Sequence, residues 1–392
     1  MRRRRHGRRA LRRAALSPDS FAPLAEALAA PGVTRELLAE RRLFERPPAL
    51  FVADFADPPT EHALHATLPV EAAGAWWTTF PPRATVLGTW LMRTPDGQLL
   101  TPRGGDAFAT DLTTIARGNG PGALDGLDLG LDWTHDGAPR ARPVEIVDLD
   151  SDVLWVGPDE SGNWGVWLLQ AVPALRHAEA IGYDGRLLCP ARPPWQRALV
   201  RAVAPRLEER IIVLEPGRGY RVGGRLTTVV QDRRNAVLGP FETAAFDELV
   251  SAAPRTGAHL FVSRAAWSRA HPGYRTLMNE AELIAAVSAA GFTVIEPETL
   301  SFAEQVAAFA GADTVVGLGG AGMFNTVFCR PGTPVLSIES SAGWADSHGC
   351  LFASRGLPYA VVFGAQESGD APHRPWRAPV GGVLEAIGRV AA

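Results

Sequence analysis

The sequence contains no lysine, so all 39 of its lysine-plus-arginine residues are arginine. Walker-type P-loop enzymes, protein kinases and pyridoxal-phosphate enzymes each depend on a lysine amine, and these classes are therefore excluded. If the protein handles phosphate, guanidinium groups and backbone N–H groups must hold it.

Cysteine and long apolar runs are also scarce. Cys189, Cys329 and Cys350 are too few for a disulfide framework, and their spacing matches no zinc site. No apolar run reaches the roughly 18 residues that a membrane-spanning helix needs. With 392 residues and a net charge of −3, the chain is predicted to be a cytoplasmic, multi-lobed enzyme that does not bind nucleic acid.

The composition changes twice along the N-terminal part of the chain. Residues 2–13 form an arginine-rich cluster, which leaves two interpretations open: contact with the anionic inner face of a membrane, or a solvated tail. Residues 17–46 are rich in alanine and leucine and are predicted to be helical. A β-rich lead-in begins at Ala84, with a hairpin turn predicted at Asp96 and Gly97. We therefore assign residues 1–83 to a basic tail and a helical or irregular extension.

Predicted strands and helices alternate after Pro143. Strands are predicted at residues 144–147, 153–156, 186–189, 211–214 and 226–230, and again at 259–263, 292–295, 313–317 and 334–338. This alternation indicates an α/β fold with two Rossmann-like lobes, over residues 84–240 and 255–392. Ligands of such sheets lie beyond the carboxyl ends of the strands, so we expect the site between the lobes, on loops of the second lobe.

One loop of the second lobe is rich in glycine. Gly317, Gly319 and Gly322 match the dinucleotide pattern G-x-G-x-x-G, and Glu339 follows at the end of the next predicted strand. Free N–H groups at the start of a helix make such a loop a natural phosphate site. A nicotinamide-dependent oxidoreductase is one interpretation of this loop, and a plain turn between strand and helix is another.

Further polar side chains follow the first strand of the same lobe. Ser263 and Arg264 end that strand, where a guanidinium group can clamp a diphosphate through two parallel hydrogen bonds. Asn279 is predicted to cap the next helix. Glu280, at the first position of that helix, is either a surface carboxylate or a group that faces the cleft. His271 lies between the two motifs in the sequence.

These motifs occur in the order and at the spacing of a known family. They comprise Ser263-Arg264, Asn279-Glu280, Gly291-Phe292, Pro297-Glu298, residues 300–305, residues 319–322 with Asn325, Pro331-Gly332 and, in the first lobe, residues 163–173. The set resembles the glycosyltransferase 61 family over about residues 84–340. The resemblance implies inverting transfer of a sugar from a nucleotide diphosphate to a hydroxyl group in polysaccharide or glycan biosynthesis. It also implies a GT-B type fold, with the acceptor on the first lobe and the nucleotide-sugar on the second.

The resemblance also suggests roles for individual residues. The donor diphosphate and nucleotide are expected to contact Ser263, Arg264, Gly319, Gly320, Ala321, Gly322, Asn325 and Glu339. Sugar transfer needs a base for the proton of the acceptor hydroxyl. Glu280 is the first candidate, with His271, Asp346 and His348 behind it. No metal or cofactor is expected, because the nucleotide-sugar is a substrate, and the acceptor is expected to be a glycan or a lipid-linked saccharide.

Two positions depart from the family pattern. Gly319 stands where the family usually carries a histidine, and Val166 stands before Trp167 where the family usually carries another. The chain must act without these two imidazole groups. A sugar-nucleotide-binding relative that has lost catalysis is therefore a further interpretation.

Two groups of residues imitate metal sites. Asp148, Asp150 and Asp152 resemble the Asp-x-Asp motif of metal-dependent transferases, but they lie beside a strand of the first lobe, far in sequence from the glycine loop. His62 and His65 lack the glutamate and the third ligand of a zinc protease. Neither group is predicted to hold a metal.

Overall fold

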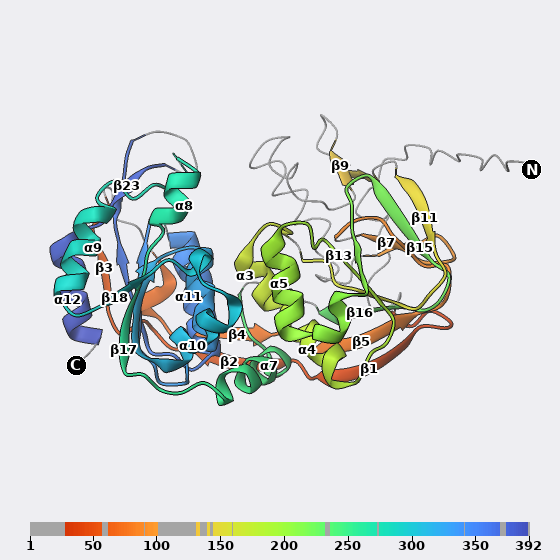
Figure 1. The fold of residues 1–392 in the computed structure, drawn as a ribbon. Helices are drawn as coiled ribbons and strands as arrows, with labels where there is room; N and C mark the ends of the chain where they lie inside the picture. The colour runs from red at the N-terminus through yellow and green to blue at the C-terminus, as the bar shows by residue number, and fades with distance from the viewer. Residues whose placement is uncertain are drawn as a thin grey trace, which may run out of the picture. The chain divides into compact units, whose positions relative to one another are not determined.

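The computed structural model describes residues 28–56, 62–89, 91–100, 131–133, 139–141, 144–158, 160–231, 236–272, 274–340, 342–368 and 374–390. The chain divides into two compact units, each built from two separate segments. Unit 1 comprises Met1–Glu40 and Gly74–Arg233, and unit 2 comprises Arg41–Ala73 and Arg234–Ala392. Figure 1 shows the elements under the labels used below.

Unit 1 contains a mixed six-stranded sheet in the order β1-β5-β16-β12-β13-β14. Its strands are β1 (Thr34–Ala39), β5 (Ala75–Phe80), β12 (Val153–Trp155), β13 (Arg186–Cys189), β14 (Ile211–Val213) and β16 (Leu226–Gln231). The last four run parallel to one another, whereas β5 pairs antiparallel with both β16 and β1. The predicted parallel half is present, and two antiparallel pairings extend it at one edge.

A second, five-stranded sheet shares the core of unit 1. Its order is β11-β15-β6-β7-β8, with β6 (Thr85–Val86), β7 (Met92–Arg93), β8 (Leu99–Leu100), β11 (Glu145–Leu149) and β15 (Arg218–Val222). In a separate two-stranded sheet, β9 (Leu131–Trp133) pairs antiparallel with β10 (Pro139–Ala141). Phe80, Trp155 and Tyr220 are among the large side chains of the common core. The turn between β7 and β8 has Gly97 at φ 100°, which confirms the predicted hairpin.

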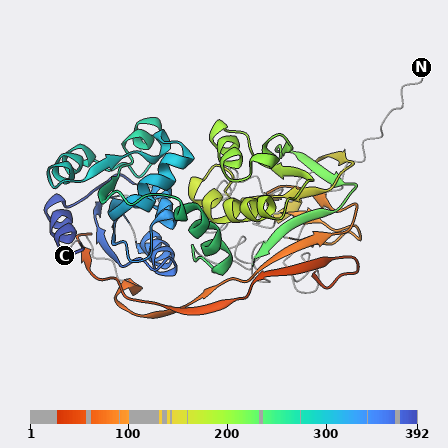
Figure 2. The same cartoon turned by 60° about the horizontal axis from the view of Figure 1, so that its bottom comes forward.

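The helices of unit 1 follow its parallel strands. They are α3 (Trp164–Val166), the π-helical η3 (Trp167–Ala171), α4 (Val172–Ala180), α5 (Pro194–Val203) and α6 (Pro205–Glu208). The green helices α4 and α5 pack together (Figure 2). Each helix connects two parallel strands, as a crossover must.

Unit 2 contains a six-stranded, all-parallel sheet in the order β18-β17-β19-β20-β21-β3. The strands are β17 (Ala258–Val262), β18 (Thr293–Ile295), β19 (Ala312–Leu318), β20 (Val335–Glu339), β21 (Tyr359–Phe363) and, from far upstream, β3 (Val52–Asp54). Numbered from β17, the first five have the order 2-1-3-4-5, which is that of a doubly wound sheet.

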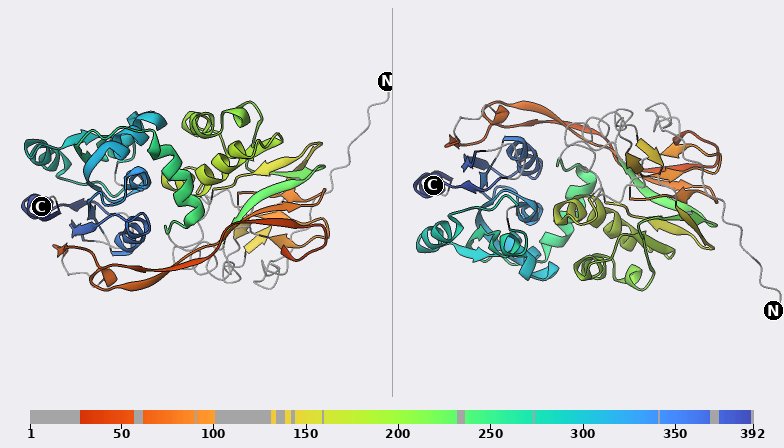
Figure 3. Two further views of the ribbon diagram at one scale, coloured as in Figure 1. Left: turned by 90° about the horizontal axis from the view of Figure 1, so that it is seen from below. Right: turned by 90° about the horizontal axis from the view of Figure 1, so that it is seen from above.

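Helices cover both faces of this sheet. Those of unit 2 are η2 (Ala63–His65), α7 (Pro240–Ser251), α8 (Ala265–Ala270), α9 (Glu280–Ala289), η4 (Pro297–Thr299), α10 (Phe302–Gly311), η5 (Ala321–Phe328), α11 (Ala342–Ser354) and α12 (Val380–Val390). Leu283 of α9 and Val383 of α12 enter one core with Phe261 and Val316 of the sheet. Helices α10 and α11 contact the sheet from its other face (Figures 1 and 3).

The prediction of a helix through residue 46 is wrong for residues 34–46. Residues 34–39 form β1, and β2 (Arg42–Arg46) pairs with β4 (Leu68–Ala72) in a separate two-stranded sheet. Alanine and leucine favour helices locally, but pairing with a distant strand overrides that preference. Residues 17–27 and the arginine cluster lie outside the described residues.

Unit 2 also contains a short two-stranded sheet and a capped helix. Short strands β22 (Ala365–Gln366) and β23 (Trp376–Arg377) pair in unit 2. Helix α10 begins with a capping box, in which Ser301 and Glu304 exchange hydrogen bonds. Of the helices that the structure describes, none is both long and apolar enough to cross a membrane.

Candidate functional site

The strand order of unit 2 singles out one place on its sheet. β18 lies on one side of β17 and β19 lies on the other, so the connection from β17 runs to one side and the next connection, from β18 to β19, crosses back to the other. At such a switch point the loops after the two strands diverge and leave room for a ligand at the carboxyl ends. Ser263 and Arg264 follow β17, and residues 319–322 follow β19. The structure therefore brings the two predicted motifs to one edge.

Arg264 lies directly against the glycine loop. Its Nη1 donates a hydrogen bond to the Gly319 carbonyl at 3.0 Å. Gly320 has φ 151°, and a Cβ built there would lie 3.2 Å from Nη1 of Arg264, so the close approach favours glycine. Burial of the guanidinium group, followed by the nearby charge of Arg275, lowers the pKa of Arg264 to about 10.

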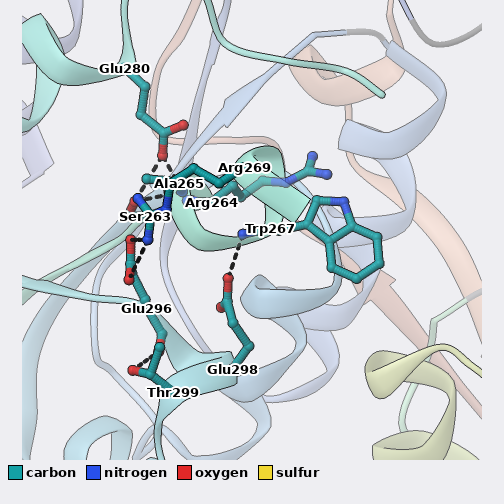
Figure 4. A network of polar contacts seen from close by, with 9 residues as sticks. All are labelled: Ser263, Arg264, Ala265, Trp267, Arg269, Glu280, Glu296, Glu298 and Thr299. Atoms are coloured by element: carbon teal, nitrogen blue, oxygen red, sulfur yellow. Dashed lines mark hydrogen bonds and ion pairs between the residues drawn. The ribbon is translucent and has the colours of Figure 1, made fainter. Parts of the chain in front are cut away.

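Glu280 holds the turn that carries Arg264. Its Oε1 accepts hydrogen bonds from the Ser263 hydroxyl and from the Arg264 backbone N–H, both at 2.8 Å (Figure 4). The Ser263 hydroxyl also accepts a hydrogen bond from the Ala265 N–H at 3.0 Å. Because Glu280 is buried at the start of α9, a helix anchored in the core delivers this carboxylate. The first candidate base thus already fixes the turn between β17 and α8.

Arg275 is a candidate functional residue to which the sequence assigned no role. Its Nη2 donates to the same Gly319 carbonyl at 3.2 Å, and its own carbonyl accepts a hydrogen bond from the Trp376 indole at 3.0 Å. Its φ of 51° is unusual for a residue with a side chain. Burial lowers the pKa of Arg275. No local signal marks this residue, because its approach to the loop depends on a left-handed turn and on Trp376.

The two guanidinium groups carry positive charge that the described chain does not neutralise by direct pairing. Within the described residues, neither Arg264 nor Arg275 forms an ion pair with a carboxylate. Two like charges that share one carbonyl, one of them buried and the other half-buried, repel each other, and an anion bound between them would offset that repulsion. Paired guanidinium donors suit the oxygens of a diphosphate.

Glu339 lies beneath the glycine loop. Its Oε1 accepts hydrogen bonds from the Ser337 hydroxyl at 2.5 Å and from Nδ1 of His348 at 2.6 Å, and both partners are fully buried. Burial opposes the charge of this carboxylate, but His348, Ser337 and then Arg275 hold the pKa of Glu339 below its usual range. A Cβ on Gly319 would overlap the carboxylate. The packing of this chain therefore favours glycine at position 319, where the family pattern usually has histidine.

Not every backbone N–H group of the glycine loop can donate to an anion, although the sequence predicted this for residues 319–322. The Gly319 N–H already donates to the Ile338 carbonyl at 2.8 Å. The loop continues into η5, a 3₁₀ helix, so its first turn is tighter than that of an α-helix. The N–H groups of Gly320, Ala321 and Gly322 are the candidate donors to an anion.

Asn279 and Asn325, for which the sequence predicted a helix cap and a donor contact, both bind backbone groups of the protein. The Asn279 side chain does not cap α9, so the prediction of a cap is wrong. Its Nδ2 donates a hydrogen bond to the Ala378 carbonyl at 2.9 Å, and its Oδ1 accepts one from the Ala378 N–H at 3.0 Å. A distant strand end thus competes successfully for the amide. Asn325 is buried in η5, where its Nδ2 donates to the Gly322 carbonyl at 3.2 Å. This hydrogen bond from a buried side chain stabilises the glycine loop.

The remaining candidate bases occupy different surroundings. His271 is exposed, and its ring stacks on Trp267 with 3.8 Å between centroids. Nδ1 of His271 lies 3.2 Å from the Trp267 carbonyl. Asp346 lies 3.4 Å from a guanidinium nitrogen of Arg46. His348 is enclosed with Glu339 in the core.

The residues that imitate metal sites have other partners. Asp148 forms a two-point ion pair with Arg221 at 2.5 and 2.8 Å, and Asp152 pairs with Arg225. His65 stacks on His62. In the parts of the chain that the structure describes, no three His, Cys, Asp or Glu side chains are grouped so that they could hold a metal ion.

The motif of the first lobe builds a helix start in unit 1. The Asn163 side chain accepts hydrogen bonds from the Gly165 and Val166 N–H groups and so caps α3. Trp167 is fully buried, and its indole N–H donates to the Ser161 carbonyl at 2.8 Å. The helix then passes through the π-helical turn η3, a feature that is frequent at functional sites.

Comparison with known proteins adds one finding. The family model described as Glycosyltransferase 61 matches residues 133–336, which is just over half of the chain. The matched region includes Arg264, Arg275, Glu280 and the glycine loop, and it ends before Glu339. A search of curated proteins finds no match.

Proposed function

Because the chain belongs to the glycosyltransferase 61 family, and is thereby an enzyme of sugar transfer, we propose that it uses a nucleotide diphosphate sugar as its donor. The acceptor in this proposal is a hydroxyl group of a glycan or of a lipid-linked saccharide. The setting is polysaccharide or glycan assembly, such as capsule formation, in the cytoplasm or on the inner face of its membrane. The paired guanidinium groups of Arg264 and Arg275 are the observation that carries the choice of donor.

The leaving group explains why two arginines are useful. As the bond between sugar and phosphate breaks, negative charge develops on the departing diphosphate. Arg264 and Arg275 are already partly desolvated, so their hydrogen bonds to that charge are stronger than they would be in water. Gly320 allows the diphosphate to approach the loop closely, and the N–H groups of residues 320–322 complete the set of donors.

The acceptor proton needs a base, and His271 fits this role better than Glu280. Oε1 of Glu280 already accepts two hydrogen bonds, which makes this carboxylate a positioning residue for Arg264. If Nδ1–H of His271 donates to the Trp267 carbonyl, Nε2 keeps its lone pair and can accept a proton. A single displacement with such a base inverts the configuration of the sugar.

The two units have separate tasks in this proposal. Unit 2 binds the nucleotide-sugar, because it contains the switch point and both arginines. Unit 1, with the motif around Trp167, binds the acceptor. This division corresponds to a GT-B type enzyme.

The experiment that tests the donor class is thermal unfolding of the full chain with different ligands. We expect uridine or guanosine diphosphate to raise the Tm more than NAD does, because a ligand that binds only the folded state stabilises it. Arg264→Ala should abolish most of that shift. Arg269→Ala is the matched control, since Arg269 is exposed on α8 and pairs with Glu296. A shift with NAD alone would overturn the proposal, and donor hydrolysis across a panel of sugar nucleotides would then identify the sugar.

A further inference from the structure

Trp344 is a large aromatic side chain beside the two arginines. It lies in the first turn of α11, shortly after the carboxyl end of β20, and 40% of its surface is exposed. The guanidinium carbon of Arg275 lies 5.2 Å from the centroid of its indole ring. An exposed indole is costly to keep in water, and this one lies next to the proposed diphosphate site.

We infer that the exposed indole of Trp344 stacks on the nucleobase of the donor and thereby selects a nucleoside diphosphate over other pyrophosphates. This inference rests on the proposed function, in which Arg264 and Arg275 hold the diphosphate. Trp344 lies beyond the region matched by the family model, which ends at residue 336. The proposed base-binding surface therefore lies outside the region that the family model matches.

The shape of the surface favours a base over other groups. An indole is flat and matches the face of a purine or pyrimidine, and stacking of a base on an aromatic side chain strengthens binding by roughly tenfold or more. Arg275 contacts both the ring and the Gly319 carbonyl, so one ribose is a suitable link between a base on Trp344 and phosphates at the arginines. A polyprenyl chain would instead need a long apolar groove.

A second exposed tryptophan shows what distinguishes Trp344. Trp267 is also 40% exposed, but its ring is already stacked on His271 at 3.8 Å. Its backbone N–H donates to the Glu298 carboxylate at 2.9 Å, which fixes α8 (Figure 4). Trp267 therefore provides a matched control: it is equally exposed and lies in the same unit, but its ring is stacked on His271, whereas the ring of Trp344 contacts Arg275 of the proposed diphosphate site.

The test is calorimetric titration of the full chain with the diphosphates of uridine, guanosine, cytidine, adenosine and thymidine, and with inorganic pyrophosphate. For whichever nucleoside diphosphate binds most tightly, Trp344→Ala should weaken binding about tenfold or more, in line with the energy of stacking. Binding of pyrophosphate should not change. Trp344→Phe should keep most of the affinity, and Trp344→Leu, which preserves apolar bulk without an aromatic face, should behave like the alanine variant.

The controls separate this inference from the proposed function. Trp267→Ala should leave nucleoside diphosphate binding unchanged, and Arg264→Ala should weaken both this ligand and pyrophosphate. If Trp344→Ala leaves the nucleoside diphosphate unaffected, or weakens pyrophosphate equally, the stacking inference is wrong while the proposed function stands. A loss confined to the complete sugar nucleotide would place the sugar on the ring and overturn the inference. If the unaltered protein binds no nucleoside diphosphate, the proposed function itself fails.

Discussion

Arg275 combines features that a purely structural arginine does not need. Its backbone is left-handed, its side chain is buried, and the like charge of Arg264 lies close by. Such strain persists only where the surroundings enforce it, and here the indole of Trp376 holds the Arg275 carbonyl. Energy stored in this way at the mouth of a site favours a binding role over a stabilising one.

Replacement of Arg275 by methionine should therefore separate binding from stability. Methionine fills most of the volume but removes one of two repelling charges, so we expect a Tm equal to or above that of the unaltered protein. Affinity for a nucleoside diphosphate should fall at least tenfold, since a hydrogen bond to a charged group contributes about 1.5–3 kcal/mol. Thermal unfolding and calorimetry on the same samples measure both quantities. A Tm several degrees lower with unchanged affinity would show that the arginine is structural.

Gly319 and Glu339 should behave as a coupled pair. A methyl group at position 319 would overlap the buried carboxylate, so Gly319→Ala should reduce the free energy of unfolding by about 1–3 kcal/mol. In a Glu339→Ser background, where the side chain is shorter, the same substitution should cost far less. Urea unfolding of the four proteins of this cycle gives the coupling energy. Additive effects would mean that the carboxylate does not determine the choice of glycine.

Residues at strand ends could be predicted from the sequence, and residues that depend on distant contacts could not. Arg264 and the glycine loop follow directly from the rule that parallel strands present their carboxyl ends at one edge. Arg275 could not be assigned, because its contact with Gly319 requires Trp376, which is 101 residues away in the sequence. Asn279 was misassigned for the same reason: its amide binds Ala378 rather than its own helix.

Helix α10 shows which features of a helix can be predicted from residues that are close in the sequence. Its capping box was predictable because both partners lie within four residues of each other. The strands β1 and β2 were not predictable in this way, since only pairing with β5 and β4 makes an alanine- and leucine-containing segment extended. Features formed by residues close together in the sequence can be predicted from it, whereas edge strands depend on the distant strands with which they pair.

The capping box also predicts a dependence of stability on pH. Hydrogen bonds first from the Ser301 side chain and then from the Ser301 backbone lower the pKa of Glu304 in the folded state. A carboxyl group with a lowered folded pKa stabilises the protein above its unfolded pKa, and this contribution disappears as the pH falls through the folded pKa. The stability difference between the unaltered protein and Glu304→Gln should therefore be present at neutral pH and shrink in acid. Chemical unfolding at several pH values measures it; a constant difference would contradict the prediction.

At the scale of the whole chain, the two units are not consecutive in sequence. Residues 41–73 interrupt unit 1 in the sequence and belong to unit 2, where they add β3 to the sheet. Arg46 fixes this segment: it is fully buried, its Nη1 donates to the Tyr359 hydroxyl at 3.1 Å, and its Nη2 donates to the Ala63 carbonyl at 3.0 Å. Unit 2, the proposed donor-binding unit, is thus completed by residues that precede most of unit 1 in the sequence.

This arrangement links the stability of the N-terminal segment to donor binding. Arg46→Ala leaves buried acceptors without their donor and should destabilise unit 2 by about 3–5 kcal/mol. Arg42→Ala, at an exposed position of the same strand β2, should have little effect. If the two units unfold in separate transitions, the one that Arg46→Ala lowers must be the one that a nucleoside diphosphate raises, by about 2.7 kcal/mol at one hundred times its Kd. Calorimetric scans with and without the nucleotide test this, and a nucleotide effect on the other transition would move the donor site out of unit 2.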